Sequence, residues 1–178
     1  MLSVAATVLL LTVAGGGGPR PEPGSVAWDG KATRLHSDST TRIRFAVPAA
    51  GYLVTAHHFA QARSGQISDG LLVSVAGEQA LLVDVLANPE RLPLDRYFET
   101  HLGFLRDPST AVTEGRAGKA KAHALLLDQP RTGQAFGQRL AVFALGSRIV
   151  KLSCPNRDDP ALARLFERAL ESFEESAP

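Results

Sequence analysis

Two adjacent histidines, His57 and His58, are the residues of this sequence best suited to bind a metal or to exchange a proton. They lie in the segment YLVTAHHF (52–59), whose residue types predict a β-strand. Neighbouring residues of a strand point to opposite faces, so the two imidazoles do not share one metal ion in simple geometry. A second metal ligand would have to come from His36, His101 or His123, and nothing in the sequence brings any of these close to His57 or His58. We expect one surface histidine and one partly buried, hydrogen-bonded histidine, with no metal and no other cofactor.

Three further residues have a chemistry that depends on their surroundings. Cys154 is the single cysteine, so no internal disulfide is possible, and a Cys–His hydrolase would need an imidazole that the sequence does not assign to it. A disulfide to a second chain stays open. Asp84 interrupts the apolar run ALLVDVL (80–86), and strand alternation predicts that its carboxylate faces solvent. His101 falls on the apolar face of a predicted helix, where we expect a residue at the edge of the core and not a catalytic base.

Recognised catalytic and ligand-binding motifs are missing from the sequence. It has no phosphate-binding glycine loop, no Gly-x-Ser-x-Gly elbow, no zinc-protease helix and no calcium loop. The central region is locally basic, and the segments 63–70 and 115–121 are predicted loops, which often carry contact surfaces. We expect any binding contacts to include Arg63, Arg116 and Lys119, the alternative being an ordinary solvated surface.

Hydrophobic periodicity predicts the elements that would position these residues. Alternating or apolar runs predict strands over 42–47, 52–59, 71–75, 80–86, 120–127, 138–145 and 148–153. We expect 42–47 to pair with 52–59, 71–75 with 80–86, and 138–145 with 148–153, and we expect 60–70 to be a loop. Apolar residues at helical spacing predict one helix over 94–105. A second helix follows the capping sequence Asp158-Asp159-Pro160 and continues to Phe173.

The order of these elements predicts the fold class. Hairpins connect strands where parallel crossovers would need helices, so the expected fold is α+β, a mostly antiparallel sheet packed by two main helices.

The N-terminus has features of export. Val4 to Ala14 form an uncharged apolar run of about eleven residues, too short for a membrane span, which needs about twenty. No Lys or Arg precedes it, which is atypical of a signal peptide. We expect a signal peptide over 1–18, a Gly/Pro-rich tether over 19–40, and a single α+β domain over 41–178. Trp28 is expected to pack on the edge of that domain. No cysteine stands near the expected cleavage zone, so no lipoprotein anchor is expected.

Charge excludes one class of partner. Nineteen Lys and Arg against eighteen Asp and Glu give a formal net charge of +1, without the basic excess that nucleic-acid binding requires.

Two stretches resemble a known family. RLAVFALGSRIVKLSC (139–154) followed by LARLFERALESF (162–173) resembles the C-terminal hairpin and helix of PsbP/DcrB-like domains. RIRFAVPAAGYLV (42–54) is similar to their opening Phe-x-Val-Pro-x-Gly-aromatic hairpin, with one extra alanine. The residues in those places are Phe45, Val47, Pro48, Gly51 and Tyr52. The resemblance covers roughly 41–173 and implies an α/β/α sandwich.

Members of that family include photosystem accessory proteins, bacterial envelope proteins and secretion-effector chaperones. They are mostly non-enzymatic and share no catalytic motif, so no functional residue carries over. Our leading hypothesis is therefore an exported, periplasmic or secreted, non-enzymatic domain that binds a protein or envelope component and has no transmembrane span in its mature form. The alternatives are a small metal-dependent or Cys/His hydrolase and an intracellular effector chaperone.

Overall fold

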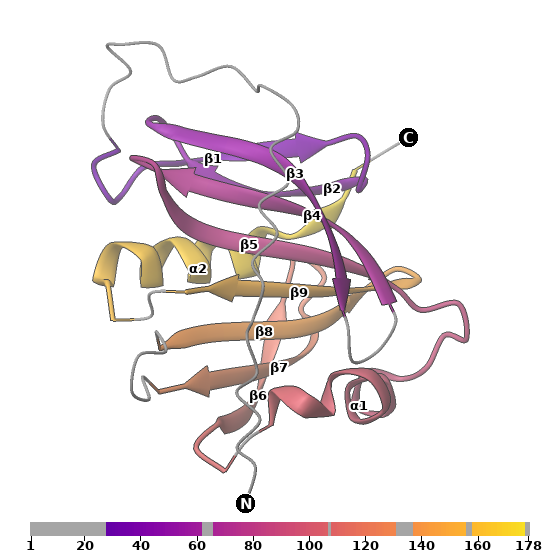
Figure 1. Cartoon of the computed structure of the whole chain (residues 1–178). Coiled ribbons are helices and arrows are strands. Elements are labelled where there is room, and N and C mark those ends of the chain that lie inside the picture. Colours follow the sequence, from indigo (N-terminus) through magenta and orange to yellow (C-terminus); the bar gives the residue numbers. More distant parts are fainter. Residues whose placement is uncertain (1–27, 62–65, 107, 131–136, 156–157, 177–178) are drawn as a thin grey trace, which may run out of the picture.

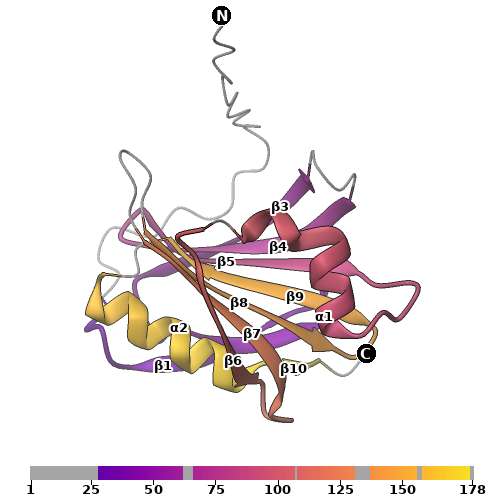
Figure 2. The same ribbon diagram turned by 90° about the horizontal axis from the view of Figure 1, so that it is seen from below.

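The computed structural model describes residues 28–61, 66–106, 108–130, 137–155 and 158–176, apart from the side chains of 58–61 and 66–68. The described chain is built in layers (Figure 1), with a seven-stranded sheet in the middle. A three-stranded sheet and helix α2 (Pro160–Ser172) cover one face, and helix α1 (Leu94–Tyr97) covers part of the other (Figure 2). The predicted α+β class, mostly antiparallel with two main helices, is confirmed.

The large sheet is antiparallel at every neighbouring pair of strands. Side by side, its strands are β3 (Tyr52–Gln61), β4 (Gln66–Val75), β5 (Glu78–Ala87), β9 (Arg148–Cys154), β8 (Gln138–Leu145), β7 (Ala122–Gln129) and β6 (Ala111–Ala117). Both faces of its central strands are largely buried, because each face packs against a separate hydrophobic cluster. The two predicted hairpins β4–β5 and β8–β9 are confirmed.

The small sheet contains β1 (Thr33–Asp38), β2 (Ile43–Pro48) and β10 (Glu174–Glu175), in the order β1-β2-β10. Helix α2 is followed closely by β10, which pairs with β2 through Glu174 and Glu175. The Ser172 hydroxyl accepts a hydrogen bond from the amide of Ala46 at 2.7 Å. The rings of Phe45 and Phe173 stack with centroids 5.0 Å apart. Residues from opposite ends of the domain therefore complete one core.

Helix α2 begins as its sequence predicts. The Asp159 carboxylate accepts hydrogen bonds from the amides of Ala161 and Leu162, and Pro160 occupies the first turn. The buried stripe contains Leu165, Phe166, Ala169 and Leu170.

The C-terminal end of α2 is capped by a distant turn. The amides of Gly118 and Lys119, between β6 and β7, donate to the carbonyls of Leu170 and Phe173 at 2.7 and 3.0 Å. These bonds satisfy carbonyls that a helix end leaves without partners. Gly118 has a φ of +67°, and a Cβ there would lie 2.7 Å from the Phe173 carbonyl oxygen, so the close approach requires glycine.

Helix α1 is short, and the helical path continues as a π turn, η1 (Phe98–Leu102), and a 3-10 turn, η2 (Gly103–Leu105). Together they occupy the range predicted for one helix. The buried side of this segment is formed by Leu94, Tyr97, Phe98, Leu102 and Leu105. Within the described residues, no helix has the length and apolar character that a membrane span requires.

Several expectations about connections are wrong. Strand β2 pairs with β1 and β10, whereas β3 pairs with β4 in the other sheet, so the predicted hairpin of 42–47 with 52–59 does not form. The segment around Gly51 carries the chain from one sheet to the next. The expected loop 60–70 is largely strand, since β3 and β4 pair as far as Gln61 and Gln66.

Two strands lie in segments that were expected to be irregular. Strand β1 falls inside the predicted tether 19–40, and β6 covers 111–117, for which no strand was predicted, and overlaps the predicted loop 115–121. Both are edge strands with mostly exposed side chains, so their sequences carry no apolar alternation.

Candidate functional site

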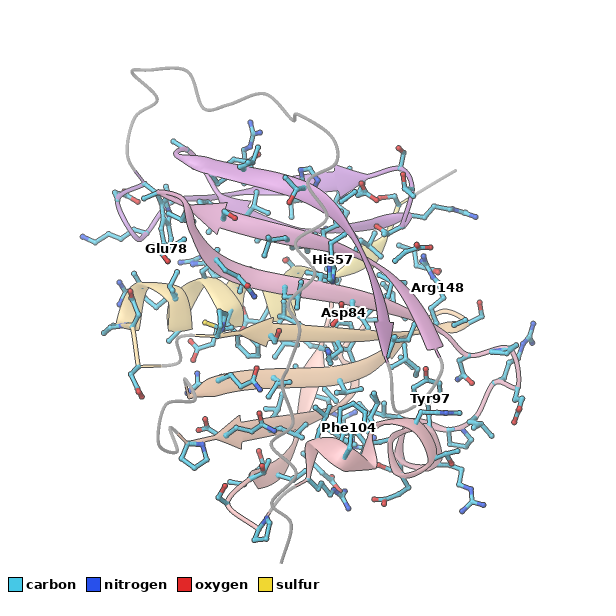
Figure 3. The ribbon with its side chains drawn as sticks, in the orientation of Figure 1. His57, Glu78, Asp84, Tyr97, Phe104 and Arg148 are labelled. Carbon is cyan, nitrogen blue, oxygen red and sulfur yellow. The ribbon has the colours of Figure 1, made fainter. Side chains whose placement is uncertain are left out.

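A buried carboxylate, Asp84, lies at the centre of the large sheet and is 0% exposed (Figure 3). His57 Nε2 lies 3.2 Å from its Oδ1, and Lys151 Nζ lies 2.7 Å from its Oδ2. The strand register pairs His57 with Gly70, Gly70 with Asp84, and Asp84 with Lys151, so the three polar side chains share one face of the sheet. We call them the polar row.

The prediction that Asp84 faces solvent is wrong. Strand β5 is buried on both faces, so alternation along the strand does not distinguish a solvent-exposed face from a buried one. The carboxylate tolerates burial because two cationic or polar partners reach it from the flanking strands.

Gly70 makes this arrangement possible. A Cβ at this position would lie 2.4 Å from the Val83 carbonyl oxygen and 3.0 Å from His57 Cδ2. Because β4 presents no side chain there, the His57 imidazole extends across β4 and reaches Asp84 on β5.

The polar row has a structural role in the described chain. The Lys151 contact is an ion pair outside hydrogen-bond geometry, and together with His57 it balances a charge that would be costly to bury alone. The single thiol, Cys154, is 0% exposed and belongs to the core on the opposite face of the sheet, so the fold does not bring it to His57. This burial also keeps the thiol from the surface, where a disulfide to a second chain would have to form.

Three other histidines, His36, His101 and His123, lie apart from the polar row. His36 meets the Phe45 ring edge-on at 6.0 Å, and its partial burial lowers its pKa below the ordinary value. His101 lies against the Tyr97 ring at 4.7 Å, at the edge of the core as expected. His123 lies opposite Arg116 in the register, and the side chain of His58 is outside the described set. Among the described residues, no three His, Cys, Asp or Glu side chains are placed to hold a metal ion.

A pocket of about 790 Å³ lies where the β4–β5 turn faces the start of α2. Its apolar walls come from Val75, Ala80, Pro155, Ala161, Leu162 and the indole of Trp28. Its polar lining comes from Asp29, Glu78, Gln79 and Asp159. We call it the Trp28 pocket. It has the mainly apolar lining with few polar groups that is typical of ligand sites.

The wall formed by Trp28 is held by its own local structure. The indole Nε1 donates to the Ala32 carbonyl at 2.8 Å, and Asp29 Oδ1 accepts from the amides of Lys31 and Ala32 at 2.7 and 2.8 Å. Gly30, with a φ of +75°, brings this turn against Ala161 in the first turn of α2. The expectation that Trp28 packs on the domain edge is confirmed.

The α2 cap and the packing of Trp28 were predicted from the sequence, but the turn at Asp29-Gly30 and the pocket were not. Asp29-Gly30 is a turn sequence and Asp158-Asp159-Pro160 is a helix cap, but no local pattern indicates that the two lie together.

Two of the predicted contact residues, Arg116 and Lys119, are described and do not line the pocket. Arg63 is outside the described residues. Arg116 is in β6 and donates to the Lys121 carbonyl at 3.5 Å. Lys119 lies in the β6–β7 turn, where its ammonium is 2.8 Å from Glu174 Oε2. A contact role for these three residues stays a prediction.

Comparison with solved structures identifies the fold. The solution structure of cyanobacterial PsbP (CyanoP) from Synechocystis sp. PCC 6803 is similar to this chain with a TM-score of 0.50 and 15% sequence identity. The similarity covers 89% of this chain and 98% of that protein. The fold is therefore PsbP-like, as the resemblance in the sequence implied. No protein-family model and no curated protein sequence matches the chain.

Proposed function

We propose, starting from the PsbP-like fold of this chain, that it is an exported, non-enzymatic, extracytoplasmic domain that binds a protein or envelope component. The observation that carries this proposal is the Trp28 pocket. It is an open hollow with apolar walls at the junction of two rigid elements, the β4–β5 hairpin and helix α2.

The lining of the pocket supports binding more than catalysis. The described residues that line it provide carboxylates and one amide but no imidazole, thiol, hydroxyl or amine side chain. Nucleophilic catalysis by a hydroxyl, thiol or amine needs one of those groups next to a base, so the carboxylates are the only candidate nucleophiles among the described lining residues. Elsewhere, the polar row uses His57 and Lys151 to balance Asp84 inside the sheet.

The export part of the proposal rests on residues 1–18 and is tested directly. We expect N-terminal sequencing of the protein purified from the envelope or medium to begin between residues 15 and 19. Exported protein that begins at Met1 would overturn the signal peptide.

The binding part is tested by site-specific photo-crosslinking in living cells. A photoreactive amino acid replaces Glu78 on the pocket rim, Arg116 in β6 or, as a control, the exposed Glu90. We expect a specific adduct from position 78 that is absent from position 90. An adduct from position 116 alone would keep the binding function but move it to the predicted basic contacts. Adducts from neither position 78 nor position 116 would overturn the proposed function.

A further inference from the structure

We propose that the Trp28 pocket binds an arginine or lysine side chain of a partner protein, presented beside an apolar side chain of the same segment. The inference rests on the proposed function, because it names the chemistry of the partner that this pocket would take.

Three carboxylates surround the hollow. Asp29 enters from the Trp28 turn, Glu78 from the β4–β5 turn and Asp159 from the start of α2. The hydrogen bonds of Asp29 and Asp159 within the described chain all use Oδ1, so each carboxylate has a second oxygen that can accept from a ligand. A guanidinium or ammonium donates to several such oxygens at once.

The charge of the lining is not balanced from within the pocket. None of its described lining residues is basic. The cations Lys31 and Arg164 line an adjoining, smaller hollow that shares Trp28 and Gly30 with the pocket. The amides of Ala32 and Lys31 also lower the pKa of Asp29, so this carboxylate stays ionised at neutral pH. Lys31 and Arg164 offset part of this charge from the adjoining hollow, but a cationic group entering the pocket still meets three carboxylates and no basic lining residue.

The indole of Trp28 adds a second mode of recognition. Its hydrogen bond to Ala32 fixes the orientation of the ring that forms part of the pocket wall. Tryptophan is the best aromatic partner for a cation, and the guanidinium of arginine also stacks on such rings.

The size of the pocket points to more than a single charged group. Its volume of about 790 Å³ lies in the upper part of the range for ligand sites, about 300–1,000 Å³. A guanidinium alone leaves the surfaces of Val75, Pro155 and Leu162 uncovered. An apolar side chain next to the basic one would cover them, which is why we infer a protein segment.

The test uses the fluorescence of the protein itself, because Trp28 is its single tryptophan. The probe is the peptide acetyl-Ala-Leu-Arg-Leu-Ala-amide, which contains no aromatic residue. Two matched peptides replace its arginine by glutamate or both leucines by glycine. We expect the arginine peptide to change Trp28 emission saturably, and each matched peptide to bind at least tenfold more weakly.

Matched variants locate the effect. Glu78→Gln removes one charge from the pocket rim and leaves the backbone hydrogen bonds of Asp29 and Asp159 in place. We expect it to weaken binding of the arginine peptide about threefold to tenfold. Glu90→Gln removes an exposed charge outside the pocket and should leave binding unchanged. Added salt should weaken binding to the unaltered protein, since charge interactions are screened within about 8–10 Å at physiological ionic strength.

Several outcomes would overturn the inference. These are equal binding of the glutamate peptide, equal effects of Glu78→Gln and Glu90→Gln, or no saturable response to the arginine peptide. Emission that depends on protein concentration without peptide would instead assign the pocket to a second copy. Emission changed by Arg20→Ala without peptide would assign it to the N-terminal segment of the chain. An adduct at position 78 combined with any of these results would retain the proposed function and reject only this partner chemistry.

Discussion

Replacing Lys151 by methionine tests the polar row most directly. The change keeps much of the side-chain volume but removes the cation 2.7 Å from Asp84, whose side chain is 1% exposed. Removing one partner of a buried ion pair costs about 3–5 kcal/mol, because the remaining charge loses its compensation. His57 still contacts the other carboxylate oxygen, and Lys151 itself is 11% exposed, so we expect the lower end, about 3 kcal/mol.

The assay is urea and thermal unfolding of a double-mutant cycle. For a chain of this size, a loss of about 3 kcal/mol corresponds to a fall in Tm of about 6–12 °C. Lys121→Met, at an exposed turn, is the control and should change stability by less than about 0.5 kcal/mol. Asp84→Leu should also destabilise the protein, whereas the double variant should recover most of the loss, since an apolar pair replaces the ion pair.

The result that would refute this reasoning is additivity. If the double variant loses the sum of the two single losses, Asp84 and Lys151 do not compensate each other. If Lys151→Met behaves like Lys121→Met, the ion pair does not contribute to stability.

Three other predictions concern packing and protonation. Gly70→Ala should destabilise the protein by about 1–3 kcal/mol, because its Cβ would meet the Val83 carbonyl and the His57 ring. Gly103→Ala should have little effect on Tm, because a Cβ there would make only an ordinary contact, 4.0 Å from the Phe98 carbonyl oxygen. Phe166→Asp should abolish cooperative thermal unfolding, because a charge would enter the core at a residue 2% exposed; Arg168→Asp on the solvent side should not. Burial lowers the pKa of His36 below 6.5, so as pH falls below 6.5 the unfolded chain takes up protons first and stability declines. His36→Phe should flatten this part of the pH dependence in urea titrations between about pH 5 and 7, and an unchanged slope would contradict the assignment.

The elements with a strong apolar pattern were predictable from sequence. Helix α2 is indicated by its Asp159 cap, by Pro160 in its first turn and by its apolar stripe. The β8–β9 hairpin is indicated by two apolar runs on either side of Gly146. The edge strands β1 and β6 were not predictable in this way. Each of them is held by backbone hydrogen bonds to one neighbouring strand. Backbone pairing of this kind does not require an apolar pattern of side chains, so the sequence does not show it.

The candidate sites depended on contacts between distant residues. The environment of Asp84 is set by His57 and Lys151, which lie 27 and 67 positions away, and by the missing side chain at Gly70. The Trp28 pocket joins the start of the described chain to the start of α2. Hydrophobic periodicity describes one helix or strand at a time, so it predicts neither the contacts of Asp84 nor the Trp28 pocket.

The position of β2 between β1 and β10 has a consequence for how the domain folds during synthesis. The side chains of Arg44 and Glu174 pair across 130 positions of the sequence, and the ring of Phe45 is covered by Phe173. A nascent chain that ends before α2 therefore leaves the inner face of β2 without its partner, and closing such a long loop is entropically costly. Contacts this far apart in sequence also slow folding. The core between β2 and α2 should therefore be completed only after α2 and β10 have left the ribosome.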